Sequence, residues 1–350
     1  MKTEKKTWGI APDGKEIILY TLTNASGASV SLSSLGAAIV SICVPDRNGV
    51  LGDVVLGYPD ALSYLGDGPC AGKCPGRFAN RIAKGRFTLD GKTYTLPINN
   101  GPNHLHGGPD GFQNQVWESR QVGDNAVEFL YFSADGEAGY PGNLKVVAHY
   151  DWNDANELKL TFTAETDAPT VLNMTNHVYF NLDAFESPSI MDHLLTLNAS
   201  EYLPTDEGKI PFGAPAPVAG TPMDFQVEKA IGRDIKADFD ALRIGKGYDQ
   251  CFLLDGAQPG QLTTAALLRS ARSGRSVELT TTQPAVQVYT GNWLSGCPAG
   301  KNGVTYEDYA AVAIECQHFP DSPNQPEYPT TVLRPGEQFA EAIIWAFKAE

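Results

Sequence analysis

The most constraining feature of this sequence is a set of segments in which apolar and polar side chains alternate with a period of two. Residues 157–166, ELKLTFTAET, place four apolar side chains on one face and four polar side chains on the other. The segment 144–152 precedes them and is joined by the polar residues NDAN, so the two segments predict a β-hairpin. Further β-branched or aromatic runs occupy 127–134, 276–282, 285–290 and 310–316.

Long amphipathic helices are missing from the pattern, although short helical turns are expected at 58–66 and near 239–242. Many strands with few helices predict an all-β fold, either a sandwich or a barrel. A length of 350 residues alone would suggest about two domains. The proline- and glycine-rich stretch 203–224 lies between strands without a change in composition, so it is expected to be an ordered connection. We therefore predict one domain over residues 1–350.

Charge and targeting signals narrow the possible partners. The net charge of −15 argues against nucleic acid, which needs a basic surface, and weakly against anionic membranes. The charge fits a neutral substrate, or it only aids solubility. No apolar stretch approaches the roughly 20 residues of a membrane span, and no apolar region follows the first lysines. These observations predict a cytoplasmic protein with free thiols at its six cysteines. We expect a monomer or a weak dimer.

His177 lies in a segment, 171–182, that reads as a strand with one apolar face. Its other face would carry a row of hydrogen-bonding side chains, namely Asn173, Thr175, His177 and Tyr179. Such a row suits a polar ligand such as a sugar, but a solvated sheet face would look the same.

Glu315 ends an apolar run, with the small residues Ala311 and Ala313 on the same strand face. Small side chains before an acid leave space above it for a ligand. A carboxylate in an apolar strand needs a reason, because burying an unpaired charge is costly. The reason is either a ligand or a structural pairing with an arginine.

Other polar residues are weaker candidates when taken singly. His104 and His106 lie in NHLHGG, a turn-forming context, and Trp293 offers a stacking surface for a pyranose. Asn80, Arg81, Asp249 and Gln287 each neighbour an apolar run. The sequence contains no nucleophile elbow, no phosphate-binding glycine loop and no dinucleotide fingerprint. We therefore expect no cofactor and no metal.

Several of these segments, taken together and in order, resemble the aldose 1-epimerase (galactose mutarotase) family. The matching pieces cover most of the chain and include GRFANRIAKGRF, INNGPNHLHGGPDGFQNQVWE, TNHVYFNL, GYDQCF, VQVYTGNWL and ECQHFPDSPNQPEYPTTVLRPGE. The resemblance implies a single large antiparallel β-sandwich of the galactose mutarotase type, with the sugar in an open cleft on one sheet.

The resemblance also implies an activity and the residues that carry it. The activity is interconversion of the α and β anomers of free aldoses of the galactose or glucose class, by acid–base opening and closure of the ring. Glu315 matches the general base and His177 the general acid. The substrate-binding residues of the family match His106, Asp249, Asn80, Arg81 and Gln287.

Three departures and three alternatives accompany this interpretation. Cys316 stands where family members often have a small hydroxylated residue. Gln250 and Cys251 stand where family members often have a histidine and an asparagine, which bears on sugar preference. One alternative is an epimerase of the same fold for a hexose 6-phosphate, which needs a cluster of cations. The others are a glycosidase with Asp249 and Glu315 as its two carboxylates, and a carbohydrate-binding protein without activity.

Overall fold

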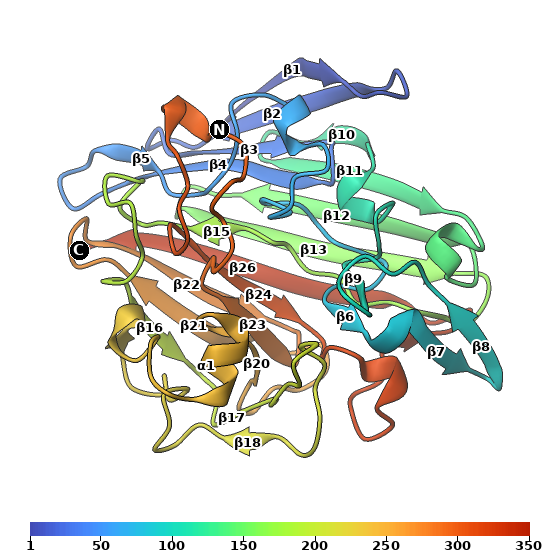
Figure 1. Cartoon of the computed structure of the whole chain (residues 1–350). Coiled ribbons are helices and arrows are strands. Elements are labelled where there is room, and N and C mark those ends of the chain that lie inside the picture. Colours follow the sequence, from blue (N-terminus) through green and yellow to red (C-terminus); the bar gives the residue numbers. More distant parts are fainter.

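Antiparallel strands dominate the computed structural model, which describes residues 1–350 (Figure 1). The largest sheet has nine strands in the order β10 (Glu118–Val122), β11 (Ala126–Ser133), β12 (Leu144–Trp152), β13 (Glu157–Thr166), β26 (Phe339–Ala349), β22 (Arg275–Thr281), β21 (Thr263–Arg269), β16 (Leu194–Leu197) and β19 (Lys229–Ala230). The hairpin expected from 144–166 is confirmed, since β12 and β13 pair from Leu144↔Thr166 to Trp152↔Leu158.

A second sheet of six strands carries three of the polar residues discussed below, Asp249, Gln287 and Glu315. Its order is β15 (Tyr179–Phe180), β24 (Val312–Gln317), β23 (Ala285–Tyr289), β20 (Asp249–Leu253), β17 (Glu201–Tyr202) and β18 (Ala216–Pro217). A third sheet, drawn in blue in Figure 1, contains β1 (Lys2–Ile10), β2 (Glu16–Thr23), β3 (Ser29–Ser33), β4 (Ala38–Pro45) and β5 (Leu51–Asp53).

The remaining elements are short. Three two-stranded sheets pair β6 (Arg81–Ile82) with β9 (His104–Leu105), β7 (Arg86–Leu89) with β8 (Lys92–Thr95), and β14 (Thr170–Val171) with β25 (Val332–Leu333). The one α-helix is α1 (Asp240–Gly245), where a helical turn was expected. Single 3₁₀ turns lie at Leu62–Tyr64, Ala83–Gly85, Phe112–Asn114, Glu137–Gly139, Ile231–Arg233, Lys301–Gly303 and Ser322–Asn324. No helix has the length and hydropathy that a membrane crossing requires.

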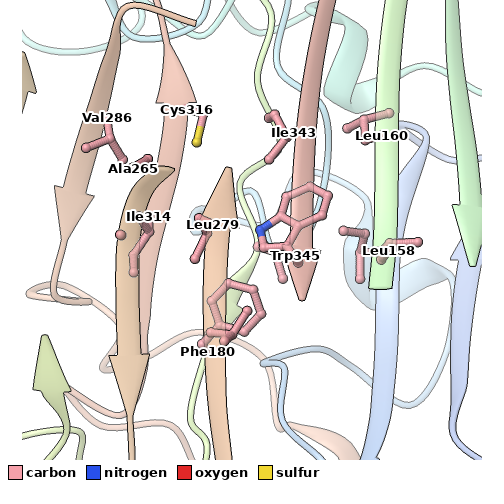
Figure 2. Packing of buried hydrophobic residues seen from close by; sticks show 14 of the residues in the cluster. Leu158, Leu160, Phe180, Ala265, Leu279, Val286, Ile314, Cys316, Ile343 and Trp345 are labelled. Atoms are coloured by element: carbon pink, nitrogen blue, oxygen red, sulfur yellow. The ribbon is translucent and has the colours of Figure 1, made fainter. Parts of the chain in front are cut away.

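The nine-stranded and six-stranded sheets share one apolar core. Figure 2 shows Leu279 and Trp345 of the larger sheet packed near Ile314 and Val286 of the smaller one. Side chains from both sheets belong to a single cluster of 59 buried residues, so the two layers form a sandwich. The all-β antiparallel sandwich expected from the sequence is thus confirmed.

Within the six-stranded sheet, β24 is buried on both faces, and this positions the site. All six residues of β24 are buried. Ile314 and Cys316 point into the core of Figure 2, so the alternate residues of the strand, Ala313 and Glu315, point to the opposite face. We call this opposite face the polar face of the six-stranded sheet.

The continuous strand predicted over 171–182 is wrong. Regular pairing covers only β14 and β15, and the residues between them bond to irregular segments. The N–H of Asn173 donates to the carbonyl of Arg77 at 2.9 Å, and the N–H of His177 donates to that of Lys73 at 2.8 Å. The predicted alternation of faces nevertheless holds, because Leu172, Met174, Val178 and Phe180 all lie in the core.

Candidate active site

A cavity of about 820 Å³ lies over the polar face of the six-stranded sheet. All seven residues predicted from the sequence line it, although they come from positions far apart in the chain. Strands β20, β23 and β24 and the segment before β15 contribute Asp249, Gln287, Glu315 and His177. The paired strands β6 and β9 bring Asn80, Arg81 and His106 to the same cavity.

Glu315 and His177 form the floor of this cavity. The register that pairs Tyr179 with Ala313 places these two residues opposite one another. His177 Nε2 lies 3.5 Å from Glu315 Oε1, and the side chains are only 6% and 3% exposed. Glu315 Oε2 and His177 Nδ1 are buried and have no hydrogen-bond partner in the protein. The pair can therefore offer both an acceptor and a donor to a bound molecule.

Burial shifts the pKa values of this pair in opposite directions. Burial raises the pKa of the Glu315 carboxyl well above its usual range, and the charge of Asp249 raises it further. Burial lowers the pKa of His177 to about 4. Between the two pKa values the pair holds a single proton, and the two groups titrate as a coupled unit. A shared proton is what an acid–base exchange requires.

His106 lies beside this pair and has a defined tautomer. Its ring centroid is 5.3 Å from that of His177. The backbone N–H of Asn80 donates to His106 Nδ1 at 3.1 Å, so neutral His106 carries its proton on Nε2. Burial lowers the pKa of His106 well below its usual value, and the neighbouring His177 and Arg81 lower it further. His106 is therefore a neutral hydrogen-bond donor.

Arg81 is held in the cavity wall by two asparagines. Its Nε donates to Asn100 Oδ1 at 3.0 Å, and its backbone N–H donates to Asn80 Oδ1 at 2.9 Å. The guanidinium is thereby fixed without a carboxylate partner. Its charge acts on both cavity carboxylates, since it lowers the pKa of Glu315 and that of Asp249.

Asp249 remains charged although it is buried. Burial acts to raise its pKa, but Lys209 and Arg81 outweigh this effect, and the pKa is lowered. Lys209 Nζ donates to Asp249 Oδ2 at 2.6 Å, and Gln287 Nε2 donates to Oδ1 at 2.8 Å. Lys209 lines the cavity and was missed from the sequence. It lies in 203–224, which was interpreted only as a connection, and no local pattern points from it to Asp249.

Three other residues named from the sequence have less central places. Gln250 does not line the cavity; its Oε1 accepts the N–H of Asp249 at 2.8 Å, so it supports the backbone rather than a ligand. His104 is buried between the Pro97 carbonyl and the Tyr140 hydroxyl, which is a structural role. Trp293 stands at the cavity rim with 57% of its surface exposed, and Lys246 Nζ lies 4.5 Å from its ring centroid.

One group of cavity residues has the chemistry of a metal site. Ligand atoms of His106, His177 and Glu315 all lie within 4.8 Å of one another. Two imidazoles and a carboxylate suit a transition metal such as Zn²⁺. The same three side chains suit proton transfer to a small polar molecule equally well.

The fold and the cavity together define a class of protein. A buried carboxylate–imidazole pair, flanked by fixed donors on one face of an antiparallel sandwich, is the arrangement of an acid–base enzyme for a small polar substrate. No group in the cavity has the partners of an activated serine or cysteine nucleophile.

Comparison with known proteins places the chain within this class. The aldose 1-epimerase family profile matches residues 19–344. A galactose mutarotase from Mus musculus is 43% identical over 98% of both chains, and an aldose 1-epimerase from Escherichia coli K12 is 41% identical over 99% of both. An aldose epimerase homologue from C. elegans superposes with a TM-score of 0.87 and 32% identity, covering 94% of this chain and 98% of its own.

The chain belongs to the aldose 1-epimerase family, and it is an enzyme that interconverts the anomers of aldoses. The family resemblance stated from the sequence motifs is thus confirmed.

Proposed function

We propose that Glu315 and His177 are the acid–base pair that opens and closes the ring of a free aldose of the galactose or glucose class. The observation that carries this proposal is the 3.5 Å separation of His177 Nε2 and Glu315 Oε1 on the floor of a polar cavity. The names of the relatives, galactose mutarotase among them, support galactose as a substrate.

The reaction needs two proton transfers and no other chemistry. Glu315 removes the proton of the C1 hydroxyl while His177 delivers a proton to the ring oxygen. The C1–O5 bond then breaks, and the aldehyde rotates about C1–C2. Closure on the other carbonyl face returns both protons and yields the other anomer. Each positioned acid or base typically contributes about 10²–10⁴ in rate.

The directions of the two pKa shifts indicate which protonation state of the Glu315–His177 pair is active. In the free protein the single shared proton rests on Glu315, because its pKa is raised and that of His177 is lowered. Moving that proton across the 3.5 Å gap gives the carboxylate and imidazolium with the same proton count. We therefore propose that activity needs the singly protonated pair. Addition of a second proton to His177 ends activity in acid, and loss of the proton from Glu315 ends it in alkali.

The remaining cavity residues would bind and orient the sugar. Nε2 of His106 is a donor placed for an oxygen near the ring. Asp249, held charged by Lys209 and Gln287, is an acceptor for sugar hydroxyls. Arg81 is a fixed donor, and its charge stabilises the negative oxygen that forms as the ring opens.

The alternatives raised by the sequence gain no support from these contacts. A phosphorylated sugar would need a cation cluster, but Arg77 is buried in bonds to Ser133, Pro141 and Thr170 and does not line the cavity. A glycosidase would need Asp249 as its second catalytic carboxylate, yet the ion pair with Lys209 and the hydrogen bond from Gln287 suit Asp249 to a charged acceptor of hydrogen bonds rather than to an acid or a nucleophile.

We also propose one folding domain and a cytoplasmic location. The core cluster runs from Tyr20 to Phe347, which supports a single cooperative unit. All six cysteines are free, which supports a reducing compartment. We propose a monomer or a weak dimer, because exposed apolar side chains such as Ile10 and Phe132 lie on different sheets. A single calorimetric transition is the expected result, together with elution from a size-exclusion column at the monomer position at low concentration. A shift toward the dimer position only at high concentration would indicate the weak dimer.

The deciding experiment is polarimetry of freshly dissolved α-D-galactose and α-D-glucose with the wild type, Glu315→Gln and His177→Ala. The wild type should speed relaxation to equilibrium, and both variants should lose most of that acceleration. If both variants still accelerate mutarotation as the wild type does, the assignment of Glu315 and His177 as the acid–base pair is wrong. Release of sugar from an aryl glycoside, or a rate seen only with a hexose 6-phosphate, would support an alternative instead.

A further inference from the structure

A fully buried ion pair lies beside the sugar cavity and has no part in the chemistry described so far. Lys73 and Asp67 contact each other, and neither side chain has exposed surface. Lys73 Nζ also donates to the Tyr64 carbonyl at 2.8 Å and to Asn114 Oδ1 at 3.3 Å. A buried ion pair is weak evidence for stability, because desolvation of both charges offsets their attraction. The pair therefore calls for another explanation.

The chain between the two charges forms one wall of the cavity. Asp67, Gly68, Pro69 and Cys70 all line it. The Ala71 N–H donates to Asp67 Oδ2 at 2.8 Å, which closes the segment into a compact loop. We call residues 67–73 the wall loop. The ion pair joins the two ends of the wall loop. The loop is also held by the Ile39 N–H, which donates to the Gly72 carbonyl at 2.8 Å, and by the Tyr179 hydroxyl, which donates to the Pro69 carbonyl at 2.9 Å.

The same loop holds the backbone of His177. The Gly72 N–H donates to the His177 carbonyl at 3.0 Å, and the His177 N–H donates to the Lys73 carbonyl at 2.8 Å. His177 precedes β15, so no regular sheet ladder fixes it. Both backbone bonds of His177 thus go to the end of the wall loop that carries Lys73.

We propose that the buried Lys73–Asp67 pair is a positioning element for the reaction, which fixes the wall loop and, through it, the imidazole of His177 against Glu315. The inference rests on the proposed role of His177 as the acid. Neither Lys73 nor Asp67 hydrogen-bonds to Glu315, so the pair acts through the wall loop and the backbone of His177.

The charge of Lys73 gives this role a separate readout. Burial is the main cause of the lowered His177 pKa, and Lys73 lowers it further. The other titratable groups that face the His177 ring are Glu315, whose Oε1 lies 3.5 Å from Nε2, and the rings of His106, Tyr179 and Tyr289. The charge of Asp249 acts on it as well and raises its pKa. Removing the Lys73 charge should therefore raise the pKa of His177, which removal of an ion pair outside the cavity would not do.

The test compares two charge-neutral double variants. Lys73→Met with Asp67→Asn removes the pair while keeping an acceptor at 67. Lys229→Met with Asp234→Asn removes a second pair, which joins at 2.8 Å, has Lys229 almost fully buried and lies outside the cavity. The first should lower kcat/KM for galactose by about 10- to 100-fold, mostly through kcat, because small misplacements of a catalytic group cost that much. The control should keep wild-type kinetics.

Histidine NMR supplies the second measurement. The His177 ring signal, assigned by its loss in His177→Ala, should titrate at higher pH in the Lys73/Asp67 double variant than in the wild type. Wild-type kcat, KM and titration in a folded double variant would overturn the proposal. If that variant does not fold, the His177 titration is measured in Asn114→Asp instead. This substitution adds a carboxylate beside Lys73 Nζ at a half-buried site, so it should offset the Lys73 charge and raise the pKa of His177. An unshifted His177 titration there would also overturn it. If the wild-type protein does not catalyse mutarotation, the proposed function is wrong. The NMR titration can still test whether Lys73 acts on His177.

Discussion

The two faces of β23 and β24, in the six-stranded sheet, are both buried but differ in chemistry. On β23 and β24 the residues Val286 and Ile314 point into the core of Figure 2. Their sequence neighbours, Gln287 and Glu315, point into the cavity and are also buried. Alternate residues of each strand therefore face the other sheet with apolar side chains, and the residues between them face the cavity with polar, reactive side chains.

This difference separates stability from chemistry. Each apolar side chain buried on the core face contributes about 1.5–3 kcal/mol through removal from water. The polar face works the other way, because burial of Glu315 and His177 disfavours their charged forms and shifts both pKa values. Substitutions on the core face should thus mainly lower stability, and substitutions on the polar face should mainly lower activity. Each of the following predictions tests this separation.

The largest effect is expected when the acid and the base are removed together. Glu315→Gln combined with His177→Ala should lower kcat by about 10²–10⁴-fold. The double variant should be little worse than either single variant, because a unit that shares one proton fails when one member is lost. Polarimetry at saturating sugar measures this. Losses that simply multiply would show that the two groups act independently.

A core substitution one residue away should leave the chemistry intact. Ile314→Ala removes buried methyl groups from the core face and should lower the free energy of unfolding by about 2–5 kcal/mol. The measurement is urea denaturation followed by fluorescence, with kcat determined well below the unfolding midpoint. A kcat within a few-fold of the wild type is expected. A large loss of kcat in the folded variant would mean that the two faces are coupled.

The sequence predicted these faces well because alternation depends only on residue order. The face of Glu315 and the strand around it follow from a period of two, and the structure agrees. The strand over 171–182 was wrong because its backbone partners, at Arg77 and Lys73, are irregular segments about 100 residues earlier. Contacts of that kind depend on the path of the whole chain. Lys209 was missed for the same reason, since no pattern in the residues around it predicts its ion pair with Asp249.

Substrate binding on the polar face should depend on one charge. Asp249→Asn should lower kcat/KM by about 10- to 100-fold, mainly by raising KM, because hydrogen bonds to a charged group contribute about 1.5–3 kcal/mol. It also leaves Lys209 without its carboxylate. Asp308→Asn is the matched control, since Asp308 pairs with Lys246 outside the cavity. Equal effects of the two substitutions on KM would argue against a sugar contact at Asp249.

The polar face should also carry a measurable cost in stability. The pKa of Glu315 in the folded protein lies above its unfolded value of 4.5. The free energy of unfolding is therefore greatest below pH 4.5, and it decreases as the pH rises from 4.5 through the folded-state pKa. Glu315→Gln should therefore raise the free energy of unfolding by about 1 kcal/mol at pH 8 and change it little at pH 4.5. Glu278→Gln, on the outer side of β22, is the control. A destabilised Glu315→Gln at pH 8 would contradict the cost assigned to the buried charge.

The smallest expected effect concerns the metal-capable group of His106, His177 and Glu315. Mutarotation needs two proton transfers, and the pair supplies both, so prior treatment with EDTA should leave kcat and KM unchanged. Added Zn²⁺ should instead inhibit in competition with galactose, because it would occupy the two groups that must exchange protons. Metal ligands must be deprotonated, so this inhibition should strengthen as pH rises. Activity lost to EDTA and restored by Zn²⁺ would reverse the assignment and make these three residues ligands rather than proton carriers.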